Sequence, residues 1–74
     1  MMRTYLTVTF NSEGELPSKI ADILYQLGFR ATHGNYDFVY EWKRNVNLQE
    51  TIELVNRVQN ALRGTNILLK FETI

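Results

Sequence analysis

Apolar residues along this chain change their spacing from two to about 3.6 and back again, and this alternation constrains the fold more than any other feature. Residues 4–10 alternate strictly between apolar and polar, which is typical of a half-buried strand. Residues 16–27 follow a polar loop and place their apolar members on one helical face. Pro17 suits the first turn of this helix, and Gly28 suits its end because glycine tolerates positive φ. The first third of the chain therefore predicts a strand followed by a helix.

Residues 29–42 predict a β-hairpin. A short strand over 29–32 and a longer strand over 36–42 are joined by residues 33–35, a three-residue connection that contains Gly and Asn. The alternation of the longer strand places its aromatic side chains on one face and its other residues on the opposite face. This aromatic set is Tyr36, Phe38, Tyr40 and Trp42.

A second helix and a last strand follow the hairpin. Asn47 is a suitable N-cap, and Glu50 stands three residues later, as the capping box requires. The helix is expected to end at Gly64, and residues 67–72 then alternate as a strand does. The predicted order of elements is therefore β-α-β-β-α-β.

This order within 74 residues predicts one α+β domain over residues 1–74, with the ferredoxin-like sandwich architecture. In that fold, two helices cover one face of a four-stranded antiparallel sheet. The apolar sets of all six elements agree with this arrangement, which is the main argument for it. The residues expected to face the core are Leu6, Val8, Phe10, Ile20, Leu24, Leu27, Phe38, Ile52, Val55, Leu62, Ile67 and Phe71.

Two surfaces are candidates for contact with a partner. Leu54, Val58 and Ala61 widen the apolar arc of the second helix beyond the stripe that one packing partner requires, which favours a homodimer. The open face of the sheet is expected to carry Tyr5, Val39 and Leu68 among threonines and charges of both signs. It is either a solvated face or a platform for a ligand or a second copy.

Composition excludes several classes of function. The eight basic residues balance the eight acidic ones, whereas a protein that mainly neutralises phosphates carries an excess of positive charge. The chain has no cysteine and one histidine, which argues against thiolate catalysis, disulfides and a zinc site. Asp37 and Glu41 are about 13 Å apart if they lie on one strand, too far for a carboxylate pair. We therefore expect no catalytic residues, no metal and no cofactor.

Targeting and membrane signals are also missing from the sequence. Residues 1–10 lack the continuous apolar stretch of a signal peptide. The longest apolar run is 67–69, whereas a spanning helix needs about 20 residues. The expectation is a soluble cytoplasmic protein.

The first strand, loop and helix resemble the opening of an ACT domain, a small regulatory module often found in amino-acid metabolism. That family's pattern runs from an Asp/Asn-x-Pro-Gly-x-Leu loop into a helix of the form Ile-x-x-x-Leu-x-x-x-Gly-Ile/Phe. The corresponding positions here are Asn11, Gly14 and Leu16 in the loop, then Ile20, Leu24, Gly28 and Phe29. The remainder of the chain shares the family's order of elements.

This resemblance implies a non-enzymatic module for sensing a small ligand or for regulating another protein. In ACT domains this loop and the adjoining dimer interface bind small ligands, typically amino acids. The resemblance therefore places a ligand at Asn11, Ser12 and Gly14. Backbone N–H groups at a helix N-terminus would favour a ligand carboxylate there.

A nucleic-acid function is the alternative. Residues 34–39 echo the RNP1 signature of RNA-recognition motifs, but turning Tyr36 and Phe38 to solvent would bury Asp37 and Glu41, at a cost of several kcal/mol each. We therefore reject that module.

Compact ferredoxin-like ribonucleases share the expected architecture, and such an enzyme would use His33, Asp37, Lys43 and Arg44. The neutral charge of the chain counts against this alternative.

Overall fold

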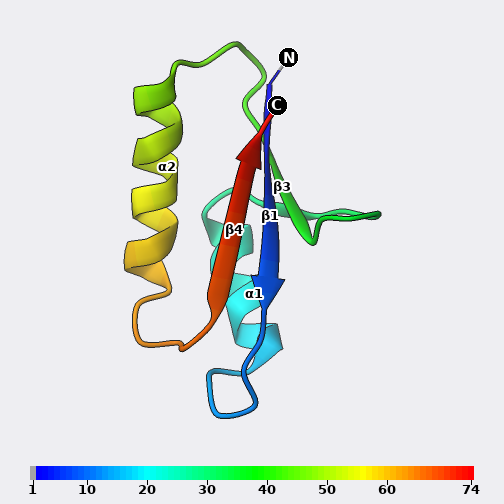
Figure 1. Cartoon of the computed structure of the whole chain (residues 1–74), viewed down its shortest axis with the longest axis vertical. Coiled ribbons are helices and arrows are strands. Elements are labelled where there is room, and N and C mark those ends of the chain that lie inside the picture. Colours follow the sequence, from blue (N-terminus) through cyan, green and yellow to red (C-terminus); the bar gives the residue numbers. More distant parts are fainter. Residues whose placement is uncertain (1) are drawn as a thin grey trace.

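A computed structural model describes residues 2–74 as a four-stranded sheet with two helices. The elements follow one another in the predicted order, and Figure 1 shows them coloured along the chain. They are β1 (Arg3–Thr9), α1 (Pro17–Gln26), β2 (Arg30–Ala31), β3 (Phe38–Glu41), α2 (Leu48–Ala61) and β4 (Leu68–Thr73).

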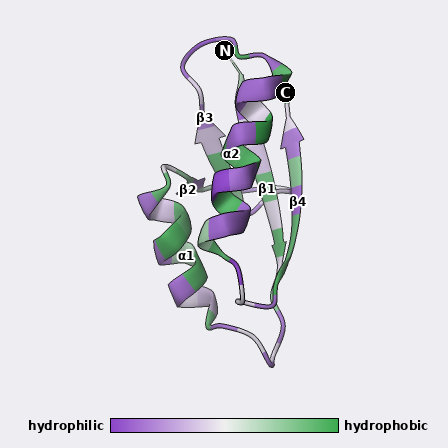
Figure 2. Ribbon diagram, turned by 90° about the vertical axis from the view of Figure 1, so that its left-hand side faces the viewer, coloured by the Kyte–Doolittle hydropathy of each residue, from purple (hydrophilic) through white to green (hydrophobic). Residues whose placement is uncertain are grey.

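The sheet has the strand order β2-β3-β1-β4, and every neighbouring pair is antiparallel. Leu6 in the central strand β1 lies opposite Phe38 of β3 on one side and Phe71 of β4 on the other. Both helices lie on one face of the sheet, in front of it in Figure 2. The predicted ferredoxin-like α+β fold is thereby confirmed.

Local signals set the ends of both helices. The predicted capping box of α2 is present: Glu50 N–H donates to Asn47 Oδ1 at 2.9 Å, and Asn47 N–H donates to Glu50 Oε1 at 3.2 Å. Pro17 occupies the first turn of α1, as expected. Gly28 follows that helix with φ of 105°, and a Cβ there would lie 2.9 Å from the Tyr40 ring. Glycine is needed at this position for both reasons.

The core joins the inner face of the sheet to both helices. Its buried apolar residues are Leu6, Val8, Ile20, Leu24, Phe29, Phe38, Leu54, Val58 and Leu62.

The prediction that Phe10 and Ile52 face the core is wrong. Phe10 is 44% exposed because β1 ends one residue earlier, so the alternation no longer holds there. Ile52 is 41% exposed because α2 turns a neighbouring stripe inward, which contains Leu54 and Val58. The prediction that Leu54 and Val58 widen the apolar arc of the helix for a second packing partner is therefore also wrong.

A buried polar cluster crosses the sheet at Thr4. The hydroxyl of this fully buried residue accepts the indole N–H of Trp42 at 2.8 Å and lies 2.8 Å from the hydroxyl of Thr73. Side chains from β1, from β4 and from the residue directly after β3 thus meet at the Thr4 hydroxyl group. The cluster satisfies polar atoms that would otherwise destabilise the core.

Tyr36 lies on the open face of the sheet, opposite to its predicted side. The strand β3 begins only at Phe38, so the two aromatic residues do not share one alternation. The Tyr36 ring stacks on Tyr5 with centroids 4.4 Å apart, and its hydroxyl donates to Glu72. Phe38 is buried, as predicted.

Neither helix among residues 2–74 has the length and apolar character needed to cross a bilayer.

Candidate functional site

A groove of about 360 Å³ lies where β1 ends and β4 begins. It is lined by Thr9, Phe10, Asn11, Ser12, Asn66, Ile67 and Leu68. Two of the three predicted ligand-binding residues, Asn11 and Ser12, line this groove, whereas Gly14 does not. The structure therefore brings the predicted loop together with the 66–68 segment, which is distant in sequence.

Asn11 organises the loop that forms one wall of the groove. Its side-chain carbonyl accepts the backbone N–H of Glu13 at 2.9 Å, and its main-chain carbonyl accepts the N–H of Gly14 at 2.9 Å. The first bond closes an Asx turn, which explains why Asn is suited to this position, and the second closes a β-turn. The side-chain NH₂ group of Asn11 and the exposed hydroxyl of Ser12 are the polar groups that this wall can offer a ligand.

Gly14 holds the loop against the chain that leads into β4. Glu15 N–H donates to the carbonyl of Thr65 at 3.0 Å, and a Cβ at Gly14 would lie only 2.6 Å from the same oxygen. Only glycine permits this approach of two backbone segments. Gly14 therefore shapes the groove through backbone packing.

A carboxylate of this chain already lies at the N-terminus of α1. Glu15 Oε1 accepts the N–H of Leu16, the N-cap residue, at 3.1 Å. A ligand carboxylate at this helix end would meet that negative charge. The groove beside the loop is thus a better place for a ligand than the helix end itself.

Residues that sequence reasoning missed supply the other walls of the groove. Phe10 and Leu68 expose apolar surface, and the exposed fraction of Leu68 reaches 73%. Asn66 adopts a left-handed backbone with φ of 59°, which asparagine tolerates better than most residues. No sequence signal linked residues 66–68 to the loop, because only the β1–β4 pairing brings them together.

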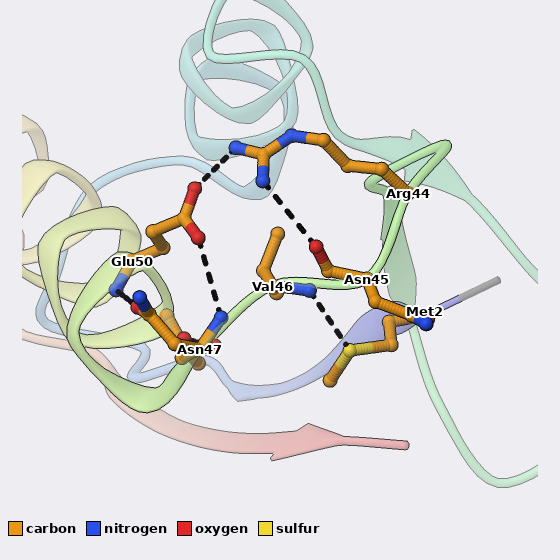
Figure 3. Close-up of polar contacts among 7 residues, drawn as sticks. Met2, Arg44, Asn45, Val46, Asn47 and Glu50 are labelled. Atoms are coloured by element: carbon orange, nitrogen blue, oxygen red, sulfur yellow. Dashed lines mark hydrogen bonds and ion pairs between the residues drawn. The ribbon is translucent and has the colours of Figure 1, made fainter.

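The residues of the nucleic-acid alternative are not brought together. His33 lies in the connection before β3, whereas Lys43 and Arg44 lie after it. Arg44 donates to Glu50 at the start of α2 and to the carbonyl of Asn45 (Figure 3), and it lies 5.9 Å from the Trp42 ring centroid. The Arg44 guanidinium therefore stabilises the connection between β3 and α2.

Asp37, the acid of that alternative, is also used structurally. Its Oδ2 accepts the backbone N–H of Val8 at 2.8 Å, and its own N–H donates to the carbonyl of Leu6 at 3.0 Å. The carboxylate is thereby part of the sheet's hydrogen bonding.

A second groove, of about 320 Å³, lies beside β3 and includes Arg30, Glu41 and Lys43 in its lining. Arg30 donates to two main-chain carbonyls and stacks over the Tyr25 ring, 4.7 Å from its centroid. Glu41 pairs with Arg3 at 3.0 Å. Because the charges of Arg30 and Glu41 already have partners, this groove is a weaker candidate for a ligand.

The shifted pKa values have structural causes. The hydrogen bond from Arg44, followed by the backbone hydrogen bond from Asn47, lowers the pKa of Glu50. The hydrogen bond to Glu72 raises the pKa of Tyr36. These shifts belong to surface pairs and do not mark a catalytic centre.

Residues 2–74 contain no cluster of three or more His, Cys, Asp or Glu side chains that could hold a metal ion.

No family of known proteins, no curated protein and no solved structure matches this chain.

Proposed function

We propose that this chain is a small non-enzymatic module that binds a small molecule in the groove beside the β1–α1 loop and thereby regulates a partner protein. The observation that carries this proposal is the meeting of Asn11 and Ser12 with Asn66 and Leu68 around one groove. The resemblance of the loop and α1 to the opening of an ACT domain supports the same function.

The groove favours a ligand with an apolar body and a polar end. Phe10 and Leu68 offer apolar surface, while Ser12 and the two asparagines offer hydrogen-bonding groups without a formal charge. Its volume of about 360 Å³ lies at the small end of the range for small-molecule sites, about 300–1,000 Å³. An apolar amino acid fits this description, with its amino and carboxyl groups at the polar wall.

Calorimetric titration with a panel of amino acids tests this function. We expect at least one apolar amino acid to bind, and Ser12→Ala to weaken it by about fivefold to tenfold through one lost hydrogen bond. Ser18→Ala is the matched control, because this serine is exposed on α1 outside the groove and should leave affinity unchanged. Equal weakening by both variants, or no binding by any amino acid, would refute the proposal.

The cytoplasm is the proposed location of this module. The chain has no cysteine, so its fold needs no oxidising compartment to form disulfides. Imaging of a tagged chain in its host cell measures this directly.

RNA binding is a second candidate because of one observation. The stacked pair of Tyr5 and Tyr36 lies on the open sheet face, where single-stranded bases can stack on aromatic rings in proteins of related topology. A labelled single-stranded RNA should then bind in a salt-dependent manner, and Tyr36→Ala should abolish binding. Lys43→Glu combined with Arg44→Glu tests in the same assay whether the basic loop after β3 contributes to RNA binding.

A further inference from the structure

The strand β4 forms an open edge of the sheet. In the order β2-β3-β1-β4 the two edge strands differ in length, since β2 has two residues and β4 has six. Figure 2 shows β4 at the right-hand side of the sheet with no other segment beyond it. A long edge strand presents unpaired backbone groups to other chains unless the fold protects it.

The β1–β4 register shows which backbone groups are unpaired. Arg3 and Ile74 exchange both of their backbone hydrogen bonds, at 3.0 and 2.9 Å. Because bonded and non-bonded pairs alternate in an antiparallel ladder, residues 68, 70 and 72 also bond to β1. The N–H and C=O groups of Leu69, Phe71 and Thr73 therefore point away from β1, where residues 2–74 supply no neighbouring strand.

Two of the usual protections of an edge strand, a proline and a bulge, are missing from β4. It contains no proline, and its register with β1 runs from Thr4↔Thr73 to Thr9↔Leu68 without a bulge. Lys70 and Glu72 are charged, but they carry opposite signs on the same face. Such a strand can pair with a copy of itself if Lys70 of one copy lies opposite Glu72 of the other.

We propose that β4 pairs antiparallel with β4 of a second copy of this chain, about a twofold axis at Phe71. The two sheets then form one eight-stranded sheet, with the four helices on the same face. The outward groups of Leu69, Phe71 and Thr73 supply the hydrogen bonds of the new ladder. Leu68 belongs both to this interface and to the lining of the groove beside the β1–α1 loop, so the dimer is tested at positions outside that groove.

Charge complementarity selects this register. With Phe71 opposite its own copy, Lys70 of each chain lies opposite Glu72 of the other, as a close non-bonded pair on the open face. Leu68 then lies opposite Ile74, so two exposed apolar side chains cover each other at both ends of the ladder. A shift to either neighbouring symmetric register places lysine opposite lysine or glutamate opposite glutamate, which is unfavourable.

An exposed apolar flank of α2 provides a second contact. Gln59 lines a groove with Leu62 and Leu69, so its side of the helix is the side next to β4. Leu48, Ile52 and Val55 share that flank, because they precede residue 59 by 11, 7 and 4 positions. Leu48 is 74% exposed. The twofold axis brings this flank toward the same flank of the second copy, where its apolar side chains leave water.

Sedimentation equilibrium with a charge swap tests the proposed pairing. We expect the native chain to dimerise, Lys70→Glu or Glu72→Lys alone to weaken the dimer by about tenfold or more, and the double swap to restore it. Lys19→Glu on α1 is the control for a general effect of charge and should leave the dimer unchanged. A monomer up to about 1 mM native protein, or no recovery in the double swap, would overturn the proposal.

Disulfide trapping tests the register, since the native chain has no cysteine. In a mixture of Lys70→Cys and Glu72→Cys chains, mild oxidation should yield mainly the mixed dimer, because those two positions face each other across the axis. Homodimers of either variant would report the shifted registers and contradict the one proposed here. Neither position lines the groove beside the β1–α1 loop, so failure of the dimer and failure of ligand binding are separate results.

Discussion

Asp37 Oδ2 accepts the backbone N–H of Val8 at 2.8 Å, in the place where a continuous strand would offer a main-chain carbonyl. The pairing of β1 with β3 extends in regular register from Arg3↔Glu41 to Leu6↔Phe38. Beyond this point the Asp37 carboxylate replaces the main-chain acceptor. The residues that precede Asp37 therefore do not follow the alternation of β3. Tyr36 is thereby able to stack on Tyr5 on the open face.

Replacing Asp37 by alanine should destabilise the protein by about 1–2 kcal/mol, because the Val8 N–H loses its acceptor in a partly buried setting. Asp37→Asn keeps a carbonyl oxygen at this place and should lose less. Urea unfolding of both variants measures the difference. Equal stability of the alanine variant and the native chain would show that water replaces the carboxylate.

Thr4→Val should cost about 1–3 kcal/mol, although valine matches threonine in shape, because the partly buried indole N–H of Trp42 and the hydroxyl of Thr73 lose their partner. Thr4→Ser retains the hydroxyl and serves as the matched control. Thermal unfolding followed through Trp42 fluorescence reports on both. A serine variant less stable than the valine variant would show that the lost methyl group outweighs the hydrogen bonds.

Gly14→Ala should destabilise the chain by about 1–3 kcal/mol through the clash of its Cβ with the Thr65 carbonyl oxygen. It should also weaken any ligand bound in the groove, since the loop can no longer approach the 65–66 segment. Ser12→Ala leaves this packing intact, so it should lower affinity without lowering the unfolding temperature. Identical unfolding temperatures for native and Gly14→Ala proteins would contradict the packing role of this glycine.

Acid should weaken the start of α2 through Glu50. A carboxyl whose pKa is lower in the folded chain than in the unfolded chain stabilises the fold at pH values above the unfolded pKa, and it loses this effect as the pH falls through the folded pKa. Glu50→Gln should therefore be less stable than the native chain near neutral pH and should converge with it in acid. Unfolding curves between neutral and acidic pH measure this convergence, and a constant difference at all pH values would contradict it.

The sequence predicted the fold because the periodicities, the capping box at Asn47 and the glycine at 28 all agree with one architecture. It mispredicted Tyr36, because a side chain such as Asp37 can replace a ladder acceptor without any sign in the alternation. On α2, both candidate stripes are apolar, and only packing on the sheet decides that Leu54 faces inward while Ile52 does not.

Only one wall of the candidate groove could be predicted from the sequence, because the other wall depends on a long-range contact. Asn11 and Ser12 lie in a local turn whose residue types are visible in the chain. Asn66 and Leu68 join them only through the pairing of the first strand with the last, and this long-range contact has no local sequence signal.

The most direct test of the ligand-binding account is an amide chemical-shift titration of the isotopically labelled chain with apolar amino acids. We predict saturable shifts at residues 9–12 and 66–68, around the groove. Shifts confined to the open face around Tyr5 and Tyr36, or no saturable shifts at any concentration, would contradict the central claim that this groove is the functional site.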